Sequence, residues 1–69
     1  MTIEEIGALI KERRQLLGLI QPDLADMAQI SINTLYKIER GEANPSVKVL
    51  NKLAEVLGLE LSIVVKKLL

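Results

Sequence analysis

One stretch, residues 21–41 with the sequence QPDLADMAQISINTLYKIERG, constrains the fold of this chain more than any other. It predicts two short helices joined by a tight turn, the first over about 22–28 and the second from Ser31 to Gly41. Ser31 is a favourable N-cap, because its hydroxyl can accept a hydrogen bond from an unpaired amide in the first turn. Gly41 is a favourable residue after the helix, because glycine enters the left-handed region at no steric cost.

Apolar spacing gives each of these predicted helices one inward face. In the first helix that face holds Leu24, Ala25 and Ala28, and in the second it holds Leu35 and Ile38. The other side chains of the second helix face outward or sideways, and these are Ile32, Asn33, Tyr36, Lys37 and Arg40.

With its flanks, this stretch resembles the phage-repressor (Xre/Cro) type of helix-turn-helix. The resemblance covers roughly residues 5–60, and its most specific part is SINTLYKIERGEANPS, where caps, core positions and loop all agree. The matching positions are Gln21, Leu24, Ala25, Ile30, Ser31, Thr34, Leu35, residues 37–41, residues 44–46, Leu57 and Gly58. The resemblance implies an all-α fold, a small lambda-repressor-like helical domain over residues 1–58, and a role in sequence-specific transcriptional regulation.

Residues 2–17 predict another helix, in front of this pair. Thr2 can cap it, and Glu5 stands at the spacing of a capping box. Its apolar stripe consists of Ile3, Ile6, Leu9, Ile10, Leu16 and Leu17.

Arg14 falls on that apolar stripe, four residues after Ile10. A charge on a core-facing stripe needs a partner, because an unpaired buried charge is strongly destabilising. Glu39 stands in the equivalent place on the later helix, four residues after Leu35. We therefore expect an Arg14–Glu39 ion pair, which the resemblance also implies, with a positional role.

The sequence departs from the family pattern at three positions. Ile20 cannot cap the helix that follows it, so Gln21 is itself the candidate cap. The resemblance implies that Gln21 contacts a DNA phosphate. The alternative is a cap that makes no contact with DNA. Gln29 stands where the family usually has glycine, and a positive φ at this residue should cost about 1 kcal/mol. Ile32 replaces a basic residue.

The last predicted helix covers residues 47–57, between Ser46 as N-cap and Gly58 as terminator. Its buried stripe should be Val47, Leu50, Leu53, Ala54 and Leu57.

In the tail, residues 59–69, the spacing of the apolar residues changes from a helical period to a period of two. Leu59, Leu61, Ile63 and Val65 alternate with other residues, which predicts a short β-strand. A lone strand leaves its backbone groups unpaired, so we expect it to pair with the same strand of a second copy and form a homodimer. A continuing helix that ends at Leu69 and a tail folded onto its own core are the alternatives.

A recognition helix enters the major groove by its N-terminal half. Asn33 can read adenine, Lys37 can reach guanine, and Ile32 can contact a thymine methyl; the resemblance assigns base reading to these same three positions. Hydroxyl donors are Ser31 and Thr34. The phosphate candidates are Gln21, Arg13, Arg40 and Asn44, while Tyr36 either reaches a phosphate or shields the helix.

The charge balance counts against nucleic-acid binding. The net charge is zero and the pI is about 6.2, whereas a pI above about 9 is the usual footprint of such domains. Residues 1–40 hold five Lys or Arg against six Asp or Glu, so a basic face must come from arrangement. The alternative function is a protein-interaction module that keeps the helix-turn-helix fold and has little DNA specificity.

The composition also excludes several other classes of protein. The chain has no His and no Cys, so we expect no enzyme activity, no metal site and no cofactor. No apolar run is long enough for a membrane span and no signal peptide opens the chain, so we expect a cytoplasmic protein. The expected function is a homodimeric repressor on double-stranded DNA, reading a palindrome with half-sites about 34–36 Å apart. The short architecture also resembles Hip-type antitoxins, which implies a possible toxin partner.

Overall fold

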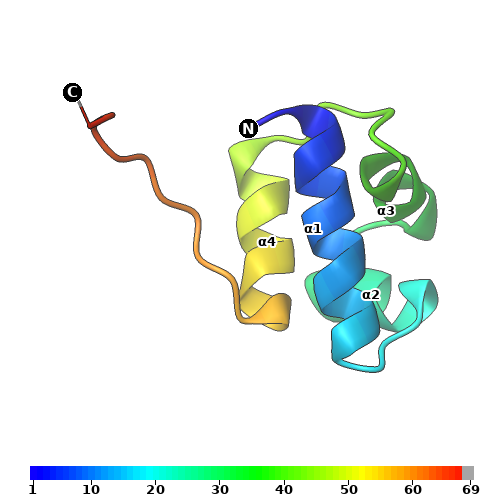
Figure 1. Ribbon diagram of the computed structural model, residues 1–69. Helices are drawn as coiled ribbons and strands as arrows, with labels where there is room; N and C mark the ends of the chain where they lie inside the picture. The colour runs from blue at the N-terminus through cyan, green and yellow to red at the C-terminus, as the bar shows by residue number, and fades with distance from the viewer. Residues whose placement is uncertain (68–69) are drawn as a thin grey trace.

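The computed structural model describes residues 1–67, and these form four helices without a β-strand. The helices are α1 (Ile3–Leu16), α2 (Gln21–Ala28), α3 (Ile32–Glu39) and α4 (Val47–Leu57). In Figure 1, α1 crosses the middle of the molecule, with α3 on one side and α4 on the other. The predicted all-α helix-turn-helix fold is therefore confirmed.

Local capping chemistry sets where the helices begin. The backbone N–H of Thr2 donates to Glu5 Oε1 at 2.8 Å, and the N–H of Glu5 donates to Thr2 Oγ1 at 3.1 Å, which completes the predicted capping box. The hydrogen bond from the Thr2 backbone lowers the pKa of the Glu5 carboxyl. Ser31 and Ser46 cap α3 and α4 in the same way, because each hydroxyl accepts from the amide three residues later.

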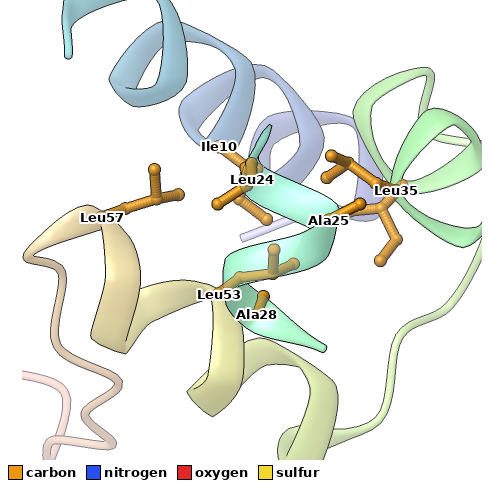
Figure 2. Packing of buried hydrophobic residues seen from close by; sticks show 8 residues of the cluster. Ile10, Leu24, Ala25, Ala28, Leu35, Leu53 and Leu57 are labelled. Carbon is orange, nitrogen blue, oxygen red and sulfur yellow. The ribbon is translucent and has the colours of Figure 1, made fainter. Parts of the chain in front are cut away.

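The core is aliphatic and draws on every helix. Leu24, Leu35 and Leu53 are completely buried, and α1 contributes Ile10. Figure 2 shows these side chains with Ala25, Ala28 and Leu57 between the helices.

Four residues of the predicted apolar stripes are exposed. Leu9 is 38% exposed and Leu17 45%, whereas Leu16 and Val47 are the most exposed, at 72% and 65%. Leu16 lies in the last turn of α1 and Val47 in the first turn of α4, where no neighbouring element covers them.

Gly7 allows α1 to approach the end of α3 closely. The residue is buried, and a Cβ added there would overlap the carbonyl oxygen of Ile38 and lie 3.1 Å from the carbonyl oxygen of Glu39. The obstacle is helix backbone, which cannot rotate away as a side chain can. A residue without a side chain is therefore needed at this position in α1.

The structure does not show the predicted C-terminal strand. Residues 59–67 form neither helix nor strand, and in Figure 1 they run away from the helices beyond α4. A strand needs a second strand to complete its hydrogen bonds, and the described chain offers none. The alternative of a continuing helix is excluded over residues 59–67, because Gly58 ends α4 with a φ of 69°.

Within the described part of the tail, residues 59–67, Leu59 is the residue that packs against the core cluster. Its N–H donates to the carbonyl of Ala54 at 2.9 Å. Ile63 and Val65 are fully exposed, which argues against a tail folded onto its own core. The predicted tail also includes Leu68 and Leu69, which lie outside the described residues. Pairing with a second copy stays a prediction.

Across residues 1–67, none of the helices has both the length and the apolar character needed to cross a membrane.

The substitution Gly7→Ala should lower the free energy of unfolding by about 1–3 kcal/mol, because the added methyl must displace backbone. Helix propensity alone predicts the opposite sign, since alanine is about 1 kcal/mol better than glycine inside a helix. Urea denaturation followed by circular dichroism measures the change, with Ala8→Gly at the neighbouring exposed position as the matched control. A Gly7→Ala variant more stable than the wild type would contradict the close approach of α1 and α3.

Candidate nucleic-acid interface

The turn between α2 and α3 has the geometry that the sequence predicts. Gln29 follows α2 with φ 57° and ψ 46°, in the left-handed region. The N–H of Ile30 then donates to the carbonyl of Ala25 at 3.0 Å, and Ser31 caps α3. A glutamine in this conformation costs about 1 kcal/mol, which the packing of the two helices must offset.

Arg14 and Glu39 form a buried, two-pronged ion pair between α1 and α3. Arg14 Nε donates to Glu39 Oε2 at 2.8 Å, and Arg14 Nη2 donates to Glu39 Oε1 at 3.0 Å. The two side chains are 10% and 2% exposed. The hydrogen bonds to Glu39 raise the pKa of the Arg14 guanidinium above its ordinary value. Arg14 Nη1 also donates to the carbonyl of Leu19 at 2.9 Å, so one side chain fixes the loop before α2 as well.

Gln21 connects α2 to the same carboxylate. Its Nε2 donates to Glu39 Oε1 at 3.1 Å. The prediction that Gln21 caps α2 is wrong, because it is the first helical residue and Ile20 occupies the cap position. Ile20 has no side-chain acceptor to offer, and its own N–H donates weakly to Asp23 Oδ2 at 3.4 Å. The side chain of Gln21 thus holds α3 in place through Glu39.

The outer face of α3 carries the predicted base-reading residues. Ile32 is 48% exposed, Asn33 and Lys37 are exposed, and Thr34 is half-buried. The Ser31 hydroxyl donates to Thr34 Oγ1 at 2.7 Å and accepts from the Thr34 N–H at 3.0 Å. The two hydroxyls are therefore hydrogen-bonded to each other at the exposed start of α3.

The C-terminal end of α3 carries a second cluster of polar side chains, which consists of Tyr36, Arg40 and Glu42. All three residues are exposed. Arg40 Nη1 donates to Tyr36 Oη, and Arg40 Nε lies 3.0 Å from Glu42 Oε2. Asn44 follows in the exposed loop that leads to α4.

The side chain of Arg13, a predicted phosphate contact, binds another part of the protein instead. Its Nε and Nη2 donate to the carbonyl of Leu57 at 3.1 and 2.8 Å, so its guanidinium satisfies the C-terminal end of α4. Sequence reasoning missed this role and also missed Gly7. An isolated glycine inside a helical pattern is the signal that could have drawn attention to Gly7; the target of Arg13 had no local signal.

The fold and the exposed face of α3 together define a helix-turn-helix domain, and comparison with known proteins agrees. The helix-turn-helix family model matches residues 10–64. The chain is 36% identical over 52 residues to an HTH-type transcriptional regulator of Methanothermobacter thermautotrophicus, covering 75% of each protein. It is 44% identical over 50 residues to the regulator DdrOP3 of Deinococcus deserti, covering 72% of this chain and 39% of that protein.

Some relatives are much longer. A protein of Methanococcus maripaludis strain C5, named for an HTH-type transcriptional regulatory role, is 40% identical over 55 residues. The match covers 80% of this chain, but the chain spans only 17% of the length of that relative.

Solved structures share the whole helical arrangement. The restriction-modification controller protein C.AhdI from Aeromonas hydrophila superposes with a TM-score of 0.81 at 31% identity, over 84% of this chain and 88% of that chain. The clp gene regulator ClgR from Corynebacterium glutamicum gives a TM-score of 0.81 at 27% identity, over 86% and 76%. The chain belongs to the helix-turn-helix (Xre-like) family, which confirms the resemblance.

Replacing Glu39 by glutamine should lower the free energy of unfolding by about 3–5 kcal/mol, because Arg14 would keep a buried charge without its counter-ion. Chemical denaturation measures the loss, with Glu12→Gln at an exposed position of α1 as the control for the change in net charge. Similar denaturation midpoints for the two variants would show that the pair does not hold α3 in place.

Proposed function

We propose that this protein is a sequence-specific repressor that binds a palindromic operator as a homodimer and occupies a promoter. The observation that carries the proposal is the division of α3 into two faces. Leu35, Ile38 and Glu39 fix its inner face in the core, while Asn33 and Lys37 stand exposed on the outer face. A helix held in this way can enter a major groove without rearrangement.

The outer residues have complementary roles in the proposed complex. Asn33 offers a donor and an acceptor to adenine, Lys37 donates to guanine, and Ile32 contacts a thymine methyl. Each good contact contributes about 1–3 kcal/mol of discrimination between bases. Residues that position the domain on phosphates and sugars are Gln21, Ser31, Thr34, Tyr36, Arg40 and Asn44.

Burial of Glu39 reconciles this proposal with the zero net charge. Its carboxylate is neutralised by Arg14 and is only 2% exposed, so it adds no negative charge to the outer surface of α3. Lys37 and Arg40 remain on that surface. A local positive face is therefore compatible with a chain that has nine basic and nine acidic residues.

The tail supports the proposed homodimer. Leu61, Ile63 and Val65 are exposed, and alternate residues of an extended segment share one face. Figure 1 shows the tail beyond α4, on the far side of α1 from α3. Pairing of two tails would bury their apolar faces and leave both α3 helices free for DNA. An antitoxin role is not part of the proposal, because neither the described residues nor the names of the relatives indicate a toxin partner.

Lys37→Glu should abolish sequence-preferential DNA binding and leave the fold intact, because Lys37 is exposed and its reversal places a carboxylate against the DNA. Fluorescence anisotropy would compare a duplex from the region upstream of the protein's own gene with a scrambled duplex, at about 50 and 200 mM salt. Lys48→Glu, exposed on α4, makes the same charge change away from α3 and should retain binding. Equal, weak binding of both duplexes by the wild type would instead favour the protein-interaction module.

Ile63→Asp should convert the dimer to a monomer of unchanged helical content, because the charge falls on the apolar face of the tail while Leu59 keeps its place in the core. Val64→Asp places the same charge on the opposite face and should leave the dimer intact. Light scattering coupled to gel filtration gives the molar masses. A dimeric Ile63→Asp variant, or a monomeric wild type, would rule out dimerisation through this face.

A further inference from the structure

Arg40 is held on two sides by neighbours from its own end of α3. Arg40 Nη1 donates to the hydroxyl of Tyr36, and the guanidinium carbon lies 5.1 Å from the centre of the Tyr36 ring. Arg40 Nε lies 3.0 Å from Glu42 Oε2. We propose that Glu42 determines specificity by occupying Arg40 until a DNA phosphate displaces it, so that Arg40 contributes little to the binding of unrelated DNA. This inference rests on the proposed DNA-binding function.

The position of Glu42 is fixed by the backbone. The N–H of Gly41 donates to the carbonyl of Ile38 at 3.0 Å, and the N–H of Glu42 donates to the carbonyl of Lys37 at 2.9 Å. Gly41 has a φ of 71°, so the chain reverses after α3 in the manner of a Schellman motif. The backbone of Glu42 is thereby placed directly after the last turn of α3, from where its carboxylate reaches Arg40.

The two contacts of Arg40 engage the edges that a phosphate would use. A guanidinium binds an oxyanion in a fork either through Nε with one terminal nitrogen or through its two terminal nitrogens. Glu42 takes the Nε of the first edge, and Tyr36 takes the Nη1 of the second. A two-pronged phosphate contact by Arg40 therefore requires one of these partners to leave.

The displacement of Glu42 from Arg40 by a phosphate affects the affinity for a specific site and the affinity for unrelated DNA differently. Binding to unrelated DNA depends on charge alone, and a carboxylate beside Arg40 cancels part of that charge. A matched site brings α3 into close contact, where a two-pronged phosphate bond replaces the exposed pair with Glu42. Glu42 thus weakens unrelated binding more than it weakens specific binding. The raised pKa of Arg40, caused first by the Tyr36 hydroxyl and then by Glu42, fits a guanidinium that already has partners.

The test uses the full chain, a duplex selected by the wild type from a random-sequence library, and a scrambled duplex. Glu42→Gln should tighten binding of the scrambled duplex about two- to fivefold, the range for an exposed ion pair, and change binding of the selected duplex less. Glu55→Gln, exposed on α4, removes the same charge elsewhere and should change neither affinity.

A double-mutant cycle separates occupation of Arg40 from simple charge repulsion. In an Arg40→Gln background, Glu42→Gln should strengthen binding of the scrambled duplex clearly less than in the wild type, because only the general charge repulsion remains once Glu42 has no partner. If the gain in that background is as large as in the wild type, or if both duplexes gain equally, the proposal is overturned. A wild type that selects no preferred duplex would instead refute the proposed function itself, and the role of Glu42 would fall with it.

Discussion

The carboxylate of Glu39 is the point on which the arrangement of the first three helices depends. It accepts hydrogen bonds from Arg14 of α1 and Gln21 of α2 while it belongs to α3. A buried charge is tolerated only where geometry and hydrogen bonds offset its loss of water, so these partners must meet in one register. Gly7 permits that register, because it lets α1 lie directly against the last carbonyls of α3.

This arrangement explains how so short a helix can hold a fixed position in the fold. α3 has eight residues, and an isolated helix of that length is not stable in water. Its stability comes from Leu35 and Ile38 in the core, from the Ser31 cap and from the buried carboxylate. All of these lie at its inner face or its start, so the residues of the outer face are not needed to stabilise the helix. The residues of the outer face can therefore vary without altering the packing of the domain.

Arg13 and Arg14 show what the apolar periodicity of a helix can predict about side-chain contacts and what it cannot. The two residues are adjacent and chemically identical, yet Arg14 meets Glu39 whereas Arg13 meets the last carbonyl of α4. Successive residues on a helix point in different directions, and the apolar stripe identified the inward one. The destination of the other depended on where α4 ends, which no pattern in α1 contains.

Sequence alone determined the features that are local or periodic. Thr2, Ser31, Ser46 and Gly58 mark helix ends through hydrogen bonds or backbone freedom within a few residues, and the 3.6-residue period selected Leu24, Leu35 and Leu53 as core. The Arg14–Glu39 pair followed because a charge on such a stripe requires a partner. Tertiary structure alone decided the rest: the close approach at Gly7, the engagement of Gln21 with Glu39, and the exposure of Leu16 and Val47. Each depends on the distance between elements far apart in the chain. The period of the tail identified an apolar face, but a strand also needs a partner, and one chain does not supply it.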